Sequence, residues 1–197
     1  MTGVVVHQEA VSAAGCVTLI DTYNACAPYS AHSDQHRNPV VAWPAARMDS
    51  VGNTAMIAAV RRCQTLTATA FEQQLYPETA ILAALGDGQG HVAHADNEQL
   101  TDGAWVPNHT PQRDFAGILY LNSAFTGGQL RFPDRGREHQ PIEGMYVTFP
   151  CTRDFVHEVT PVGQGRRYSL AVWFTTRPEH ASSPLRWALG EAGAQHG

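Results

Sequence analysis

The spacing of hydrophobic and polar positions along the chain changes near residue 77. From 9 to 25, and again from 49 or 50 to 76, apolar residues recur every three to four positions, which predicts two helices. Pro28 and Pro77 follow these segments and are typical of helix ends. The second segment is the longer, so its apolar face can cover a neighbouring sheet.

Short apolar runs replace the helical pattern after residue 77. Gly, Pro, Asp or Asn bounds each run, as expected for strands. Seven such runs are predicted, at 81–85, 91–95, 117–121, 129–132, 145–149, 156–159 and 168–174, in addition to a strand at 40–43. Short strands at near-regular spacing, preceded by a long helix, indicate an antiparallel sandwich or barrel of the jelly-roll kind.

This order of elements predicts a mainly β protein with N-terminal helices, built as a single domain over residues 1–197. We expect a helical support region at 1–77, a jelly-roll core at 78–176, and a C-terminal tail at 177–197 with one amphipathic stretch at 185–189. Of the 197 residues, 43% are hydrophobic and 16% are charged, which suffices for a sizeable core and excludes wholesale disorder.

The net charge of −5 and the absence of any Lys/Arg run give no electrostatic footprint for a nucleic acid or an anionic membrane surface, so we expect neither partner. The first residues lack the basic region of a signal peptide, and no stretch approaches 18 apolar residues, so we expect a cytoplasmic protein. Its four cysteines are irregularly spaced and are predicted to be reduced thiols.

Two His-x-Asp patterns occur among the 10 histidines of the chain. His32 and Asp34 lie in a polar segment where turn hydrogen bonds explain both residues. His94 and Asp96 lie at the end of a predicted strand, where residues i and i+2 share a face and can bind one ion. His157, in a later strand, could supply a third ligand. Two histidines and one carboxylate form the facial triad of non-haem Fe(II) oxygenases, which leaves positions open for a co-substrate and O₂.

Arg167 and Ser169 lie two positions apart in the last predicted strand, so their side chains project to one face. A forked cation beside a hydroxyl suits a carboxylate at a fixed distance from a metal. Taken alone, Arg167 is better explained by a surface ion pair, because Arg is common on strands. Strand parity predicts that His91 faces away from His94.

The stretch from His91 to Thr175 resembles the catalytic core of the iron- and 2-oxoglutarate-dependent prolyl hydroxylase superfamily, most closely its prolyl 3-hydroxylase and prolyl 4-hydroxylase members. The pieces that carry the resemblance are HVAHADN, RDFAGILYLNSAFTGGQLRFP and FVHEVTPVGQGRRYSLAVWFT. HADN and RDFAGILYLN are most similar to the prolyl 3-hydroxylase branch. The resemblance implies a double-stranded β-helix core, a jelly roll like that of the cupins. It also implies Fe(2+) as cofactor, with 2-oxoglutarate and O₂ as co-substrates.

The resemblance places His94, Asp96 and His157 at the iron-ligand positions of the family. It places Arg167 where a basic residue binds the 5-carboxylate of 2-oxoglutarate, and Tyr120 where hypoxia-sensing relatives have a tyrosine that bonds the same carboxylate. In related halogenases a small residue replaces the carboxylate ligand, so the presence of Asp96 implies hydroxylation.

Further residues carry weaker assignments. Ser169 falls where many members of the wider superfamily place a supporting hydroxyl, and Arg113 matches an arginine near the substrate in relatives. The hypoxia-sensing relatives have a second co-substrate tyrosine ten residues before the first ligand, where this chain has Ala84. Trp105 lies in a predicted loop beside the site, as a candidate for a lid or substrate wall, or as a residue that packs its own loop.

The activity that the resemblance implies is a hydroxylase reaction coupled to decarboxylation of 2-oxoglutarate to succinate. Loops at 28–44, 98–112 and 134–143 would define the substrate pocket, and their cationic or titratable residues could hold a carboxylate. These are His32, His36, Arg37, His109, Arg135, Arg137 and His139. We therefore expect a small-molecule amino acid, a proline-like imino acid or a small peptidyl substrate, with a prolyl residue in a protein target as an alternative.

Two other classes of protein are consistent with parts of the pattern. A cupin-like metal enzyme that does not use 2-oxoglutarate would retain its function without Arg167. A catalytically silent binding module would retain its function without the metal. The sequence does not indicate an oligomeric state.

Overall fold

The structure is a computed structural model that describes residues 3–30 and 38–191. Its helices are α1 (Ala13–Cys26), α2 (Ser50–Phe71) and α3 (Ser183–Ala188). Its strands are β1 (Val5–His7), β2 (Val41–Ala42), β3 (Tyr76–Leu85), β4 (His91–His94), β5 (Glu98–Thr101), β6 (Ala104–Pro107), β7 (Phe115–Tyr120), β8 (Phe125–Gly127), β9 (Leu130–Phe132), β10 (Arg137–His139), β11 (Tyr146–Pro150), β12 (His157–Val159), β13 (Val162–Gly165) and β14 (Arg167–Thr175).

Polar side chains fix where α1 and α2 begin. The Ser12 hydroxyl accepts a hydrogen bond from the backbone N–H of Gly15, and the Asp49 carboxylate accepts one from that of Gly52 at 2.7 Å. The predicted end of the second helix at residue 76 is wrong, because Glu72 adopts the left-handed conformation (φ 54°) and stops the helix at Phe71.

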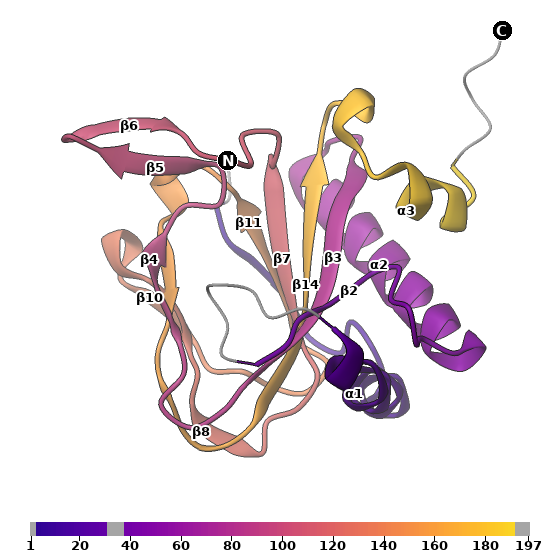
Figure 1. Ribbon diagram of the computed structural model, residues 1–197. Coiled ribbons are helices and arrows are strands. Elements are labelled where there is room, and N and C mark those ends of the chain that lie inside the picture. Colours follow the sequence, from indigo (N-terminus) through magenta and orange to yellow (C-terminus); the bar gives the residue numbers. More distant parts are fainter. Residues whose placement is uncertain (1–2, 31–37, 192–197) are drawn as a thin grey trace, which may run out of the picture.

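The largest sheet is antiparallel and has the strand order β1-β11-β7-β14-β3-β2. Helices α1 and α2 cover one of its faces, on the right in Figure 1. A smaller sheet, β10-β9-β12-β4, lies on the other side, and β8 pairs with β13 at the foot of the molecule. This arrangement is the jelly-roll core behind N-terminal helices that the sequence predicts, and that prediction is confirmed.

Two apolar cores hold these layers together. The first lies between the helices and the large sheet and includes Met56 of α2 and Leu170 of β14. The second lies between the two sheets and includes Phe132 of β9 and Phe149 of β11. Alternate residues of β14 therefore face opposite cores. This alternation determines which of its side chains can reach the space between the sheets.

All seven strands predicted after residue 77 are present, as is the strand near residue 41. Other strands lie where loops or turns were expected, among them the hairpin of β5 and β6, which projects beyond the two sheets in Figure 1. Strand β1 lies within the region that was expected to be helical. No helix within residues 3–30 and 38–191 is long and apolar enough to cross a membrane. The four cysteines are free thiols, and all are buried.

Candidate iron and co-substrate site

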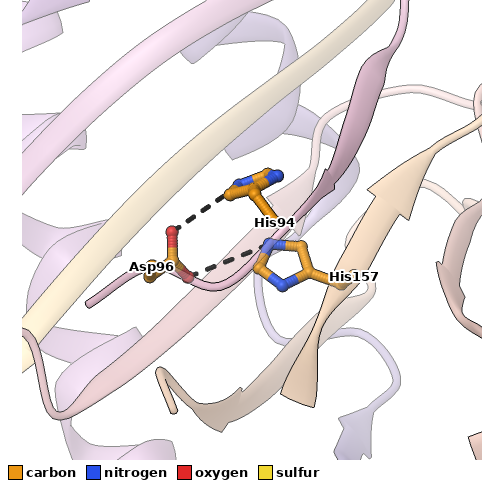
Figure 2. A group of neighbouring side chains, drawn as sticks. All are labelled: His94, Asp96 and His157. Atoms are coloured by element: carbon orange, nitrogen blue, oxygen red, sulfur yellow. Dashed lines mark ion pairs between the residues drawn. The ribbon is translucent and has the colours of Figure 1, made fainter. Parts of the chain in front are cut away.

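Strand pairing brings the two predicted histidine ligands together. His94 is the last residue of β4, His157 is the first of β12, and the two are paired directly across the strands. Their ring centroids are 4.5 Å apart. Asp96 follows two residues after His94 and points between the two rings, as Figure 2 shows.

The three side chains form a cluster of metal-ligand type. Their nearest ligand atoms lie within 4.8 Å of one another. The Asp96 carboxylate is 3.9 Å from Nε2 of His94 and 3.8 Å from Nε2 of His157. Adjacent ligands of one octahedral ion are separated by about 3 Å, so shifts of under about 1 Å would complete the coordination.

Both imidazoles are held with Nε2 directed to the cluster. Nδ1 of His94 donates to the carbonyl of Val92 at 2.8 Å, and Nδ1 of His157 donates to that of Phe155 at 3.0 Å. The proton therefore resides on Nδ1, and the lone pair of Nε2 is available to a cation. Burial lowers the pKa of His157, which favours the neutral ring that a metal requires.

The environment of Asp96 also fits a metal ion. Asp96 is 7% exposed, and its Oδ2 accepts no hydrogen bond from any described residue. A buried carboxylate without donors is costly unless a cation compensates it. The two histidines and one carboxylate thus fit Fe(II) by donor type, geometry and charge.

A second unsatisfied group lies on β14. Arg167 is 3% exposed, and its Nη1 donates to the hydroxyl of Ser169 at 3.1 Å. Its Nε and Nη2 are buried and have no hydrogen-bond partner in the described part of the chain. Tyr120 lies opposite Ser169 in the sheet, and its ring centre is 4.9 Å from the Arg167 guanidinium carbon.

The Tyr120 hydroxyl is likewise buried and unpartnered among the described residues. Burial raises the pKa of Tyr120, and the charge of Arg167 opposes that shift only in part, so the hydroxyl stays protonated and can donate. A guanidinium and a phenol with free donors in a buried position match one carboxylate. The surface ion pair that the sequence left open for Arg167 is not formed with any described residue.

Arg113 lies near the other end of this face of the sheet. Its Nε donates to the Glu78 carboxylate at 3.0 Å, and its guanidinium carbon is 4.2 Å from the centre of the Trp173 ring. Trp173 is half-buried. Its Nε1 is buried without a hydrogen-bond partner in residues 3–30 and 38–191. An acceptor on a ligand could therefore be bound here.

The structure places two positions that the sequence singles out, and it shows that the parity argument for His91 is wrong. Ala84 belongs to the core on the helical side, while its neighbour Ala83 is paired with Ser169 on the side of Arg167. Ala84 is thus not a co-substrate position. A β-bulge in β4 shifts His91 into register with Val159. His91 therefore lies on the same face as His94, and their ring centroids are 6.4 Å apart.

The other loop candidates are dispersed. Trp105 lies in β6 opposite Leu100 and is partly buried, so its contact with a substrate stays a prediction. Arg135 packs over the Phe155 ring and donates to the carbonyl of Asp154, which explains it structurally. His109 and Arg137 are exposed, and His139 packs edge-on against Phe132. His32, Asp34, His36 and Arg37 lie outside the described residues.

A hollow of about 820 Å³ lies elsewhere, on the helical side of the large sheet. Residues of α2, the start of β3 and α3 line it, among them Arg61, Tyr76 and Arg186. It contains none of the three clustered ligands, so its size carries no weight for the chemistry of the site.

Sequence comparisons agree with this arrangement. The family described as the 2OG-Fe(II) oxygenase superfamily matches residues 80–175. Prolyl 3-hydroxylase 3 of Mus musculus is 38% identical over 100 residues, and prolyl 3-hydroxylase 1 of Gallus gallus is 36% identical over 100 residues. Each match covers 46% of this chain and 14% of the relative, so the chain corresponds to a small part of those proteins.

Solved structures share the fold. The viral collagen prolyl hydroxylase of Paramecium bursaria Chlorella virus-1, in complex with 2OG, matches with a TM-score of 0.64 and 18% identity over 88% of this chain and 96% of that one. A prolyl-4-hydroxylase of Pseudomonas putida matches with a TM-score of 0.64 and 22% identity over 89% and 93% of the two chains. At these identities, the likeness shows the fold alone.

Proposed function

Because the chain belongs to the 2OG-Fe(II) oxygenase superfamily through residues 80–175, we propose that it hydroxylates a proline-like residue in a peptidyl or amide-linked substrate. Family membership implies Fe(II), 2-oxoglutarate and O₂ and does not favour a cupin-like enzyme without 2-oxoglutarate. Two features of one protein together carry the proposal. The Asp96 carboxylate of the triad and the Arg167 guanidinium of β14 are both buried and both have polar atoms without hydrogen-bond partners among the described residues.

In this proposal, His94, Asp96 and His157 hold the iron. When bound, the iron with 2-oxoglutarate and O₂ supplies an oxidative decarboxylation that yields succinate and CO₂ and places an oxygen atom in an unactivated C–H bond. Arg167 binds the far carboxylate of 2-oxoglutarate through Nε and Nη2, while Ser169 holds its Nη1 in place. Tyr120 donates its hydroxyl proton in a hydrogen bond to the same carboxylate.

The substrate would bind toward the Trp173 end of the same sheet face. Interior-facing positions of β14 run from Arg167 and Ser169 to Trp173, so co-substrate and substrate groups are separated along one strand. Glu78 already neutralises Arg113, and a second carboxylate there would leave an excess negative charge. A neutral carbonyl acceptor therefore suits Arg113 and the Trp173 N–H better than a free α-carboxylate. Prolyl 3-hydroxylases, the curated relatives, support a prolyl target.

A substrate panel tests this proposal. Iron-loaded protein is supplied with 2-oxoglutarate, O₂ and free L-proline, N-acetyl-proline amide or short prolyl peptides, and succinate and product mass are followed. We expect the capped or peptidyl substrates to gain one oxygen atom with matching succinate. Modification of the free amino acid alone would contradict the carbonyl argument. Absence of 2-oxoglutarate turnover with every compound would contradict the proposed class of enzyme.

A further inference from the structure

All three proposed iron ligands lie at or beyond the end of the strand ladder, with His94 as the last residue of β4. His157 is the first residue of β12, and Asp96 lies two residues beyond the end of β4. The pairing of His157 with His94 fixes those two rings. The position of Asp96 relative to His157 therefore depends on contacts outside the ladder. Asn108 and Thr110 donate to the carbonyl of Asp96, and further contacts join the segments 96–98 and 151–155.

Backbone bonds and one carboxylate connect these segments. The carbonyl of Cys151 accepts hydrogen bonds from the backbone N–H groups of Asp96 at 3.1 Å and Asn97 at 3.3 Å. The Glu98 carboxylate accepts the backbone N–H of Arg153 at 2.8 Å and lies 2.9 Å from Nη2 of the same residue. Glu98 thus contacts both the main chain and the side chain of Arg153.

The Arg153 end of this contact leads directly to a proposed ligand. Arg153 begins the 3₁₀ turn Arg153–Phe155, and the carbonyl of Phe155 accepts the Nδ1–H of His157. Glu98, two residues after Asp96, is therefore connected through one short turn to the hydrogen bond that orients the His157 ring. The Glu98 side chain is 15% exposed, although the bond that it accepts from Arg153 lies at the surface.

We propose that Glu98 is a positioning residue for the iron site, because it fixes the turn that orients His157 relative to the carboxylate of Asp96. This inference rests on the proposed function. The bond from the backbone N–H of Arg153 to the carboxylate is the main contribution, since it is charge-assisted and its donor is held in place by the turn. The Arg153 guanidinium is 52% exposed and contributes little.

Metal affinity tests the inference without recourse to activity. Metal-free protein is titrated with Co(II) under anaerobic conditions, and binding is followed by the visible absorption of the ion. Groups that support metal ligands typically change affinity by 10–100-fold, so Glu98→Ala should weaken Co(II) binding about tenfold or more. Arg153→Ala keeps the backbone N–H and should weaken binding by less than about fivefold. Glu138→Ala removes the carboxylate of the Arg131 pair on the same small sheet and should leave affinity unchanged.

A second variant guards against misfolding of Glu98→Ala, which thermal unfolding of the metal-free protein would reveal. Arg153→Pro deletes the N–H at the first position of the turn, where proline is well accommodated after the extended Thr152. We expect it to weaken Co(II) binding as Glu98→Ala does. Wild-type affinity in a folded Glu98→Ala or Arg153→Pro protein would overturn the inference. Failure of the wild type to bind Co(II) or Fe(II) would contradict the proposed iron site itself, and the role of Glu98 with it.

Discussion

The guanidinium carbon of Arg167 lies 4.9 Å from the centre of the Tyr120 ring, and both side chains keep buried polar atoms without partners among the described residues. A buried cation without an anion reduces the free energy of unfolding. An arrangement of this kind favours ligand binding at the cost of stability. It therefore predicts opposite effects of substitution on the stability of the free protein and on the affinity for 2-oxoglutarate.

Replacing Arg167 should separate these two effects. Arg167→Met removes the uncompensated charge but keeps much of the apolar volume, so the melting temperature of the free protein should stay the same or rise. Loss of the charged partner should weaken 2-oxoglutarate binding by about 2–5 kcal/mol while iron stays bound. Thermal unfolding and a 2-oxoglutarate titration of the iron-loaded protein check both effects. An unchanged 2-oxoglutarate requirement would mean that another residue anchors the co-substrate.

Two buried tyrosines form a matched pair for the hydroxyl argument. Tyr120→Phe removes an unpartnered hydroxyl, so stability should be maintained while 2-oxoglutarate affinity falls by about 1 kcal/mol. Tyr146→Phe removes a hydroxyl that lies 2.7 Å from the Thr67 hydroxyl, so stability should fall by about 1–3 kcal/mol with no change in affinity. Denaturant unfolding and calorimetric titration measure the two quantities. Equal effects on stability would refute the assignment of Tyr120.

The free protein should lose stability in mild acid. Burial lowers the pKa of His157 below 6.5; the nearby Asp96 carboxylate opposes this shift, and His94 adds to it. The unfolded chain therefore takes up a proton at a higher pH than the folded protein, so stability falls as the pH drops from about 6.5 toward the folded pKa. Above that range, His157 is neutral in both states and adds no slope.

The same pH dependence can be assigned by substitution. His157→Gln should flatten the melting temperature of the metal-free protein between about pH 5 and 7. The flattening should be partial, because burial also lowers the pKa of His7 and His139. His139→Gln, on the same sheet, should also flatten the slope in part, by the share that the burial of His139 contributes. Identical slopes for wild type and His157→Gln would show that His157 does not resist protonation.

Arg113 should affect the prime substrate alone. Arg113→Gln keeps a side chain beside Trp173 and a donor for Glu78 but loses the guanidinium, so we expect the KM for a prolyl peptide to rise about tenfold, as expected when one hydrogen bond to a charged group is lost. Succinate formed without prime substrate should be unaffected, because Arg167 and the triad are intact. Steady-state kinetics with varied peptide and varied 2-oxoglutarate distinguish an effect on the prime substrate from an effect on the co-substrate. A selective rise in the KM for 2-oxoglutarate would place Arg113 at the co-substrate instead.

Most of the sheet could be predicted because its strands are short apolar runs with clear boundaries. The hairpin of β5 and β6 was missed, although Asp102 and Gly103 both adopt positive φ, and Asp-Gly is a strong signal for a tight hairpin turn. Leu100 is the one apolar residue of β5, and both strands are largely exposed, so no alternation of apolar and polar positions marks the hairpin. The end of α2 was missed because a left-handed Glu72 carries no glycine signal.

The triad and Arg167 could be proposed from residue types, spacing and resemblance. The structure clusters His94, Asp96 and His157 and places Arg167 on β14 next to Ser169 and the Tyr120 ring. What could not be predicted depends on contacts distant in sequence. From the sequence, Trp173 is an ordinary aromatic residue in a strand. Only the structure shows that its N–H has no partner among the described residues and that the Arg113 guanidinium lies over its ring. Glu98 belongs to no sequence motif. Its proposed role depends on a hydrogen bond to a turn 55 positions further along the chain, which the local sequence does not indicate.

The central claim, an iron- and 2-oxoglutarate-dependent oxygenase site at the triad, is tested most directly by succinate formation from 2-oxoglutarate. Wild-type protein and Asp96→Ala are compared with and without Fe(II), in the presence of O₂ and a prolyl peptide. The account predicts iron-dependent succinate from the wild type and none above background from Asp96→Ala. Succinate formed equally by Asp96→Ala, or none from the iron-loaded wild type with any substrate, would contradict it.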